Sequence, residues 1–309
     1  MLVEKPMEQR QTSKTVIMSE LQYLVNGELV PESEASVSVR DRGFMYGDAA
    51  FETLRVYGGT PFEWDRHMDR LQHSCDQLGF GDAVPSGSVL LDQINRMLAA
   101  NALSDAYVKL SVTRGVQPGK LTPNRNVDPT VVGICSPLPR GGITGERVWD
   151  TPATVSLVET TQPPASALPP SAKTHNYLPG ILARLELRES NADEALLCST
   201  DGFLTEGATS NLFFVREGVL TTPDVTLPLL PGITREVVLE LAVELDIPVE
   251  TGEYRPDVLT EATELFLTNS TWEIRPVSDC GDHAYDVGPV TRRLQRAFDE
   301  RVELLYTTA

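Results

Sequence analysis

The stretch Pro137-Leu-Pro-Arg-Gly-Gly-Ile-Thr-Gly145 divides the sequence into two parts. Its prolines and glycines interrupt helices and strands alike, and such a cluster between patterned segments is typical of a linker. We therefore expect an interdomain linker at residues 138–145, between a small domain at residues 21–137 and a larger domain at residues 146–309. Residues 1–20 are polar and contain no apolar core, so we expect a flexible N-terminal extension there.

Before the linker, strand patterns and helix patterns are mixed. Asn26-Gly27 stands between the short runs Tyr23–Val25 and Glu28–Val30, which predicts a β-hairpin. Apolar residues recur at helical spacing in Glu63–Leu78 and again in Val89–Ala100. Strands are expected at Ala35–Val39, Ala50–Val56, Tyr107–Thr113 and Pro129–Cys135. The first part is therefore expected to contain both helices and paired core strands, within an α+β fold.

After the linker, the patterns predict a part that is richer in strands and flanked by helices. The strands are expected at Thr154–Glu159, Ala195–Ser199, Asn211–Val215, Gly218–Thr221, Pro248–Tyr254 and Glu264–Leu267. The helices are expected at Tyr177–Ser190, Ile233–Leu245 and Val290–Leu304. No internal repeat interrupts this series.

The charge balance excludes two classes of partner. The net charge is -18, from 44 acidic and 26 basic residues. Nucleic acid and anionic membrane surfaces both require basic patches, so neither is expected as a partner. No run of about 18 apolar residues occurs, so no membrane-spanning helix is expected. Few of the basic residues are lysine, which suggests a halophilic protein; such a protein is expected to lose structure when salt is removed.

The cysteines and histidines give no sign of a disulfide or metal framework. The four cysteines are far apart and form no CxxC pair, which is typical of free thiols in a reducing compartment. The four histidines lack the spacing of metal ligands. We therefore expect a cytoplasmic protein without a metal site.

Three segments carry candidate functional groups. In Leu230-Pro-Gly-Ile-Thr-Arg-Glu236 the amides of Ile233 and Thr234 would begin a helix, where free N–H groups favour an anion. Lys173 lies where a proline-rich loop meets a helix, a position from which its amine could bond an aldehyde. Glu206 lies in a turn of small residues before an apolar strand, where it could meet a buried cation. Taken singly, these features are also compatible with an ordinary helix start, a surface lysine and a turn glutamate.

Together, these segments belong to an ordered series of motifs that runs from about Leu24 to Phe298. The motifs are Asp41-Arg-Gly-Phe-Met-Tyr-Gly-Asp48, Phe51-Glu-Thr-Leu-Arg55, His67-Met-Asp-Arg-Leu71, Ser171-Ala-Lys-Thr-His-Asn-Tyr177, Asp193-Glu-Ala-Leu196, Glu206-Gly-Ala-Thr-Ser-Asn-Leu212, Leu230-Pro-Gly-Ile-Thr-Arg235 and Phe266-Leu-Thr-Asn-Ser270. The series resembles the class IV aminotransferases, the fold-type IV pyridoxal 5'-phosphate (PLP) enzymes. The resemblance implies PLP as the cofactor, and a small N-terminal α/β domain followed by a larger β-rich C-terminal domain with flanking helices.

The resemblance also implies roles for individual residues. Lys173 would be the catalytic lysine that carries PLP as a Schiff base, and Glu206 would pair with the pyridine nitrogen. Tyr177 is a candidate partner for the phenolate oxygen of the cofactor. The groups that would hold the phosphate are Arg70, the amides of Ile233 and Thr234, and Ser270 with its neighbour Asn269.

Within the family, the substrate-facing positions resemble the 4-amino-4-deoxychorismate lyases most. Branched-chain aminotransferases typically have glycine in place of Thr53 and arginine in place of Lys109. D-amino acid aminotransferases use an arginine and a histidine in the loop that corresponds to Val116–Leu121, which contains neither. Lyases share the threonine, the lysine and Phe-Leu-Thr-Asn-Ser. The residues expected to contact an anionic, ring-bearing substrate are Lys109, Arg55, Tyr46 and Lys120.

The resemblance therefore favours a 4-amino-4-deoxychorismate lyase of folate biosynthesis, which releases pyruvate and 4-aminobenzoate through an external aldimine. The alternative is an aminotransferase for branched-chain or other amino acids with 2-oxoglutarate, because the two reactions share every step up to the carbanion. A non-catalytic binding protein would be expected to have lost Lys173, Glu206 or Arg70, and all three are present. A small amino-acid-like substrate and a homodimer with shared active sites are further implications.

Overall fold

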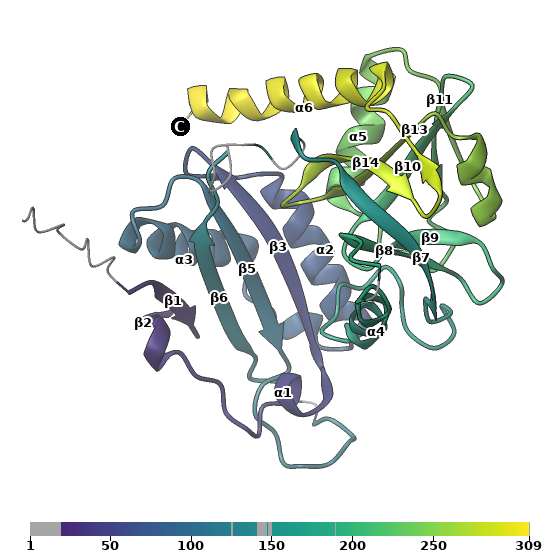
Figure 1. The fold of residues 1–309 in the computed structure, drawn as a ribbon. Helices are drawn as coiled ribbons and strands as arrows, with labels where there is room; N and C mark the ends of the chain where they lie inside the picture. Colours follow the sequence, from purple (N-terminus) through teal and green to yellow (C-terminus); the bar gives the residue numbers. More distant parts are fainter. Residues whose placement is uncertain (1–19, 125, 141–146, 148–149, 189, 309) are drawn as a thin grey trace, which may run out of the picture.

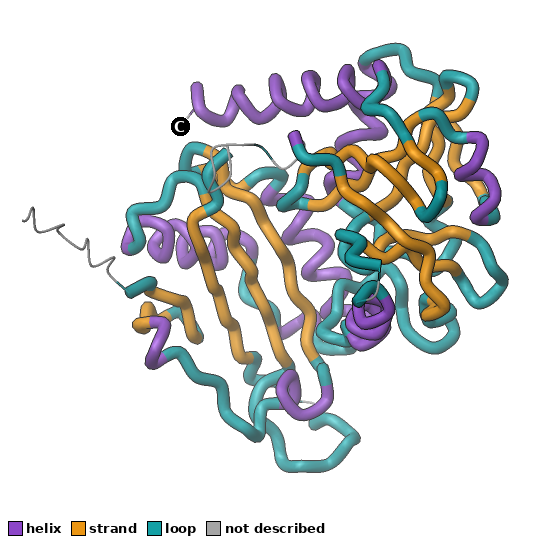
Figure 2. The backbone as a smooth tube through the Cα atoms, viewed as in Figure 1, coloured by secondary structure: helices purple, strands orange, loops and turns teal. Residues whose placement is uncertain are grey.

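The computed structural model describes residues 20–124, 126–140, 147, 150–188 and 190–308. Most of the predicted N-terminal extension and residues 141–145 of the predicted linker lie outside these described residues. One sheet is built from strands that precede the predicted linker and another from strands that follow it, as Figures 1 and 2 show.

The first sheet has six strands in the order β2-β1-β6-β5-β3-β4, and all its neighbours are antiparallel. The strands are β1 (Gln22–Val25), β2 (Glu28–Pro31), β3 (Ala49–Tyr57), β4 (Thr60–Pro61), β5 (Ala106–Thr113) and β6 (Thr130–Pro137). The predicted hairpin and three of the predicted strands are thereby confirmed. Helices α2 (Trp64–Gln77) and α3 (Gly87–Ala100) cover one face of this sheet.

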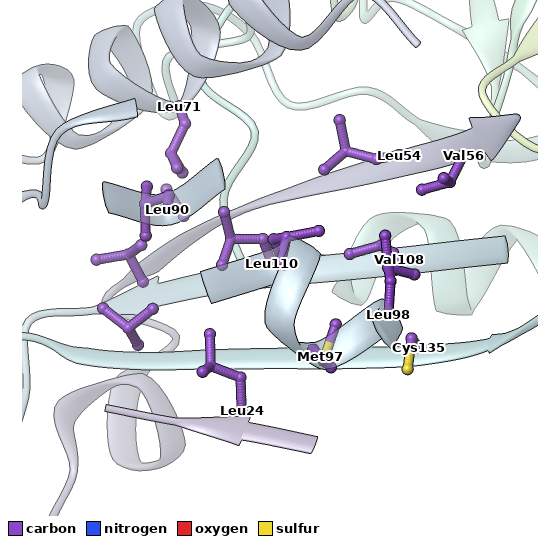
Figure 3. Packing of buried hydrophobic residues seen from close by; sticks show 14 of the residues in the cluster. Leu24, Leu54, Val56, Leu71, Leu90, Met97, Leu98, Val108, Leu110 and Cys135 are labelled. Atoms are coloured by element: carbon purple, nitrogen blue, oxygen red, sulfur yellow. The ribbon is translucent and has the colours of Figure 1, made fainter. Parts of the chain in front are cut away.

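The core of this part fills the space between the sheet and these two helices (Figure 3). It is formed by alternate strand residues and by one side of each helix, as the two periodicities require. Labelled members include Leu24, Leu54, Val108, Leu71 and Leu90. The opposite face of β3 and β5 is consequently free to carry functional side chains.

The prediction of a strand at Ala35–Val39 is wrong. After β2 the chain makes a 3-10 turn at Glu32–Glu34, and the following residues pair with no strand. Val37 is 41% exposed and Val39 is 74% exposed. The alternation of valine with serine imitates a strand, but no buried face exists here for it to cover.

The second sheet has nine strands, in the order β12-β11-β10-β13-β14-β7-β8-β9, with β15 paired to β14. β9 also pairs with β10, so the path from β10 through β13, β14, β7 and β8 returns to its start and closes. The strands are β7 (Ala153–Thr161), β8 (Glu194–Cys198), β9 (Leu204–Gly207), β10 (Asn211–Arg216), β11 (Val219–Pro223), β12 (Val249–Gly252), β13 (Glu264–Asn269), β14 (Glu273–Cys280) and β15 (His283–Ala284).

Three of these strands had no sequence prediction: β9, β14 and the two-residue β15. β9 is only four residues long, and β14 contains Arg275, Pro276 and Asp279, which mask its apolar alternation. β14 nevertheless lies centrally, between β13 and β7. Its long-range partners stabilise it where the local pattern is weak.

Three helices flank the second sheet: α4 (Leu178–Glu186), α5 (Ile233–Glu244) and α6 (Pro289–Thr308). All three were predicted. α6 packs against α5 and β14 and extends across to the first sheet (Figure 1). At that end, Tyr306 Oη donates to Asp105 Oδ1 at 2.6 Å, which fastens the last helix to the first part. No helix in the described ranges has the length and apolar character needed to cross a bilayer.

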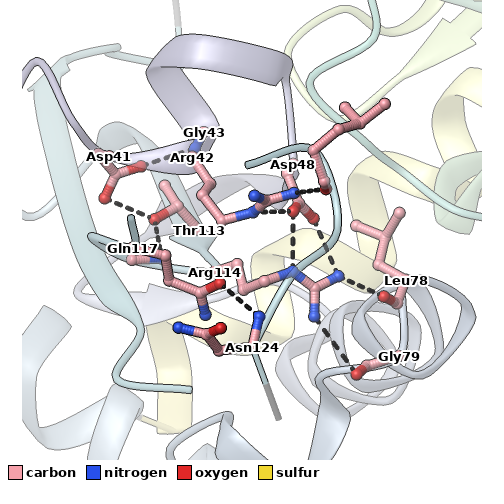
Figure 4. Close-up of polar contacts among 12 residues, drawn as sticks. Asp41, Arg42, Gly43, Asp48, Leu78, Gly79, Thr113, Arg114, Gln117 and Asn124 are labelled. Carbon is pink, nitrogen blue, oxygen red and sulfur yellow. Dashed lines mark hydrogen bonds and ion pairs between the residues drawn. The ribbon is translucent and has the colours of Figure 1, made fainter. Parts of the chain in front are cut away.

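The Asp41–Asp48 motif forms a short helix, α1 (Arg42–Tyr46), and a buried ion-pair network (Figure 4). The carboxylate of Asp48 accepts hydrogen bonds from Arg42 Nε at 2.7 Å and from Arg114 Nε at 2.8 Å. Both arginines are about 5% exposed or less. The motif therefore fixes the end of the first sheet, and its charged residues serve the fold.

Candidate active site

A cavity of about 710 Å³ lies between the two sheets. Its walls come from β3 and β5 of the first sheet, from β9, β13 and the start of α5 in the second part, and from the proline-rich loop before α4. The cavity brings together nine of the residues predicted from sequence: Arg70, Lys109, Lys173, Tyr177, Glu206, Ile233, Thr234, Asn269 and Ser270.

Lys173 reaches the cavity from a segment that pairs with the edge of β3. The amide of Phe51 donates to the carbonyl of Lys173 at 3.0 Å, and the amide of His175 donates to the carbonyl of Ala49 at 3.0 Å. Lys173 Nζ donates to Tyr177 Oη at 2.9 Å and lies 4.5 Å from the centroid of the Phe51 ring. A lysine from beyond the predicted linker is thus held by a strand from before it.

Glu206 lies on β9 and faces the same cavity. Its Oε1 accepts a hydrogen bond from Gln162 Nε2 at 2.8 Å, and its Oε2 accepts one from the amide of Leu230 at 3.1 Å. Burial raises the pKa of this carboxyl to about 8, although the Leu230 amide and the charge of Lys173 act to lower it. Glu206 forms no ion pair with any described residue. A cation bound beside it would favour its charged form.

Arg70 lies on α2 and is held by a carboxylate that the sequence analysis did not single out. Its Nε and one terminal nitrogen donate to the two oxygens of Glu52 at 2.8 and 2.7 Å. His67 Nδ1 lies 2.7 Å from the same carboxylate. Burial would raise the pKa of Glu52, but the charge and hydrogen bonds of Arg70, with those of His67, bring it to about 2. Arg70 is therefore oriented by a permanently charged partner.

The start of α5 lies beside Arg70. Arg70 donates to the carbonyl of Pro231 at 3.0 Å, which places the guanidinium next to the helix N-terminus. Gly232 is the N-cap and supplies no side-chain cap, so the amides of Ile233 and Thr234 keep their donors for a ligand. A Cβ at Gly232 would overlap Asn211 Oδ1, so the close approach of these segments requires glycine.

The turn after β13 contributes the remaining predicted residues. Asn269 Oδ1 accepts hydrogen bonds from the amides of Thr271 at 3.0 Å and Trp272 at 2.7 Å, so this side chain shapes the turn. Ser270 also lines the cavity. The hydroxyl of Thr268 is buried in the cavity wall and has no hydrogen-bond partner. It is therefore available to a bound group.

Lys109 places a second amine in the cavity, from β5. Its Nζ lies 4.4 Å from the centroid of the Phe51 ring, the ring that Lys173 also contacts. Burial, followed by the charge of Lys173, lowers the pKa of Lys109. No carboxylate of the described chain pairs with it. His175, close by, has its pKa lowered to about 4 by burial and by Lys109, so it is neutral at physiological pH.

Three residues predicted to contact the substrate do not line the cavity of this chain: Arg55, Tyr46 and Lys120. Arg55 is 4% exposed, donates to the carbonyl of Thr271 at 3.0 Å and pairs with Glu273 at 3.4 Å. Its charge is already neutralised within the fold. Tyr46 is the last residue of α1 and Lys120 lies in the loop after β5, and both are exposed. We do not assign these three residues to the site of this chain.

Several residues that shape the site were missed: Phe51, Glu52, His67, Gln162 and Thr268. The first three lie within motifs quoted from the sequence, three or four residues before Arg55 or Arg70, which were assigned, so their motifs gave a signal. Thr268 lies within the quoted motif Phe266–Ser270, directly before the assigned Asn269, so its motif also gave a signal. Gln162 had none, because a lone glutamine in a loop is an ordinary feature.

The groups around the cavity fit PLP. Lys173 offers an amine for the aldehyde, and Glu206 offers a carboxyl that lacks a cation where a ring nitrogen could supply one. Arg70, the helix amides and the unpartnered hydroxyl of Thr268 supply donors for a phosphate. The described residues contain no cluster of three or more side chains suited to a metal ion.

Comparison with known proteins gives the same family. The family model described as amino-transferase class IV matches residues 49–280. A putative branched-chain-amino-acid aminotransferase of Methanocaldococcus jannaschii is 36% identical over 283 residues, which are 91% of this chain and 96% of that protein.

Solved structures agree. The branched-chain aminotransferase of Thermoproteus uzoniensis superposes with a TM-score of 0.84 at 27% identity, covering 92% of this chain and 95% of that one. The 4-amino-4-deoxychorismate lyase of Pseudomonas aeruginosa superposes with a TM-score of 0.77 at 32% identity, covering 90% and 98%. This chain therefore belongs to the class IV aminotransferase family and is a PLP-dependent enzyme of fold type IV.

Proposed function

We propose that this enzyme is a lyase that splits 4-amino-4-deoxychorismate into 4-aminobenzoate and pyruvate. The observation that carries the proposal is the unpaired amine of Lys109, which lies in the cavity together with Lys173. The proposed substrate bears an amine and a carboxylate on its ring and a second carboxylate on the enolpyruvyl ether, so it needs a cation besides the cofactor-bearing lysine. Lys109 would supply that cation. The likeness to the lyase of P. aeruginosa, at 32% identity, supports the same choice.

Each residue of the site would have its own role in this reaction. When bound, PLP supplies a sink for the electron pair left on the substrate carbon that loses its proton. Lys173 Nζ would hold the cofactor, and after displacement by the substrate amine it would accept that proton as a neutral base. Tyr177 Oη, 2.9 Å away, would keep the amine in position. Glu206 would be the counter-charge of the protonated ring nitrogen, and Arg70 that of the phosphate.

An aminotransferase that acts on branched-chain amino acids with 2-oxoglutarate is the second candidate. It is favoured by the M. jannaschii relative, which is 36% identical and is named as a putative branched-chain aminotransferase. In this case Lys109 would bind the single carboxylate of the amino acid. Both candidates use Lys173, Glu206 and Arg70 in the same way, so these residues do not separate them.

One pair of assays separates the candidates. The PLP-loaded protein is incubated with 4-amino-4-deoxychorismate, and separately with leucine and 2-oxoglutarate. We expect 4-aminobenzoate and pyruvate in equal amounts from the first mixture. Glutamate from the second mixture, with no 4-aminobenzoate from the first, would overturn the lyase proposal in favour of the aminotransferase. Lys173→Ala, expected to be inactive in both, controls for contaminating enzymes.

We also propose that the enzyme is a homodimer and that it works in the cytoplasm of a halophilic organism. Apolar side chains are exposed together around α1 and the loop after β5: Phe44 is 73%, Met45 is 41%, Val116 is 53% and Leu121 is 77% exposed. A second copy would cover this surface. Light scattering in concentrated salt is expected to give twice the chain mass of 33.9 kDa. A mass of one chain at micromolar concentration would contradict the dimer.

A further inference from the structure

Ser74 joins the two residues that would hold opposite ends of the cofactor. It lies on α2, four residues after Arg70, and its side chain is fully buried. Its Oγ donates to the carbonyl of Arg70 at 2.7 Å and accepts a hydrogen bond from the amide of Lys173 at 2.9 Å. One hydroxyl thus bridges the main chains of Arg70 and Lys173, although Ser74 and Lys173 are 99 residues apart in sequence.

This hydroxyl is the acceptor on which the amide of Lys173 depends. The carbonyl of Lys173 is bound on its other side by the amide of Phe51 at 3.0 Å. Within the described chain no second acceptor contacts the Lys173 amide. Ala172 is 8% exposed and Ser74 is not exposed at all, so water does not readily replace the hydroxyl. A buried donor that loses its acceptor bears the full penalty of desolvation.

We infer that Ser74 is a positioning residue, which fixes the main chain of Lys173 at the distance from Arg70 that PLP requires. PLP carries its aldehyde and its phosphate on one rigid ring, so both can be engaged only if their two protein partners are correctly spaced. The inference rests on the proposed placement of PLP between Lys173 and Arg70. It does not depend on which reaction follows.

The same segment offers a matched control. Ser171 lies two residues before Lys173, and its Oγ is 3.0 Å from His73 Nε2, which is also on α2. This contact is exposed, and Ser171 touches neither Arg70 nor the main chain of Lys173. Ser171→Ala therefore removes a link between the same two segments without removing the bridge that Ser74 makes.

The test compares two cofactor forms on cofactor-free protein. Pyridoxamine 5'-phosphate keeps the ring and the phosphate but has no aldehyde, so it cannot bond to Lys173; PLP can. Dissociation constants of both are measured for the wild type and for Ser74→Ala, Ser74→Thr and Ser171→Ala. In Ser74→Ala we expect the affinity for PLP to fall roughly tenfold and that for pyridoxamine 5'-phosphate less than about threefold. Ser74→Thr keeps the hydroxyl and is expected to restore the PLP preference, and Ser171→Ala to retain it.

Equal losses for the two cofactors in Ser74→Ala would overturn the inference, because a general loosening of the fold acts on both. An equal loss of PLP preference in Ser171→Ala would also overturn it. If Ser74→Ala does not fold, Ser74→Cys, which keeps the shape with a weak acceptor, is expected to show the same selective loss. Failure of the wild type to form a borohydride-stable bond between PLP and Lys173 would instead contradict the proposed function itself.

Discussion

Glu52, which pairs with the cavity-lining Arg70, and Glu206, which lines the cavity itself, have pKa values that move in opposite directions. Glu52 has no exposed surface, yet the nearby Arg70 and His67 bring its pKa to about 2. Glu206 receives hydrogen bonds from neutral amides only, and burial raises its pKa to about 8. The surroundings of Glu52 therefore contain a counter-charge, whereas the described surroundings of Glu206 form no ion pair with it.

This difference separates a structural ion pair from a binding group. A buried carboxylate that already has its cation stabilises the fold and orients that cation, which here is the arginine expected at the phosphate. A buried carboxyl without a cation is costly for the protein alone, and such strained titration is typical of functional sites. The missing charge beside Glu206 is what the ring nitrogen of PLP would supply.

The largest effect on stability is expected from removing Glu52, the partner of Arg70. Glu52→Ala should lower the unfolding free energy by about 3–5 kcal/mol, because Arg70 is then left buried without its partner. Denaturant unfolding of the cofactor-free protein in high salt measures this. Glu261→Ala removes the exposed partner of Arg216 and should lower it by less than about 1 kcal/mol. Equal effects of the two substitutions would contradict the structural role of Glu52.

Glu206→Gln should raise the free energy of unfolding of the cofactor-free protein, whereas Glu52→Ala lowers it. The unfolded chain loses this proton near pH 4.5 and the folded protein near pH 8, so the wild type loses stability as pH rises through that window. Between pH 5 and 8 the variant should gain about 3–4 kcal/mol relative to the wild type. Saturating PLP should remove most of the difference, and parallel stability profiles without cofactor would disprove the raised pKa.

A third change tests whether the amine of Lys109, which pairs with no carboxylate of the described chain, serves the substrate. Lys109→Met should lower kcat/KM for 4-amino-4-deoxychorismate by roughly tenfold or more, because a charged hydrogen bond to the substrate is lost. The absorption spectrum of bound PLP should not change. Lys120→Met, on an exposed lysine outside the cavity, should change kcat/KM much less. Similar losses in both variants would remove Lys109 from the substrate site.

The smallest effect is expected from Gln162→Ala. Its amide donates to Glu206 at 2.8 Å and so favours the charged form of the carboxyl. Without this donor the pKa of Glu206 should rise further, by less than about one unit. The stability profile used for Glu206→Gln would then shift to higher pH. A shift to lower pH would show that Gln162 does not act on the carboxylate.

Much of the fold could be predicted because local patterns agree with long-range packing. The hairpin at Asn26-Gly27 and the helix around Arg70 carry the expected turn and spacing, and both are confirmed. The prediction of a strand at Ala35–Val39 was wrong because alternating apolar and polar residues do not by themselves provide a partner strand. β14 was missed because Arg275 and Pro276 hide a strand that its neighbours stabilise.

The site could be predicted only as far as the motifs extend. They identified the groups that line the cavity, including Lys173 and Glu206. They gave no information on pairings made by the fold, such as Ser74 with Lys173, 99 residues apart. Nor did they show that Arg55 is neutralised by Glu273, which lies far along the chain. These pairings depend on how the two sheets meet.

The central claim is that one amine, that of Lys173, bonds the cofactor. Wild-type protein is incubated with PLP, reduced with borohydride, digested and analysed by mass spectrometry. The account predicts a single phosphopyridoxyl adduct on the peptide that contains Lys173. An adduct on Lys109 or another lysine instead, or a Lys173→Ala protein that binds PLP covalently and retains normal turnover, would contradict it.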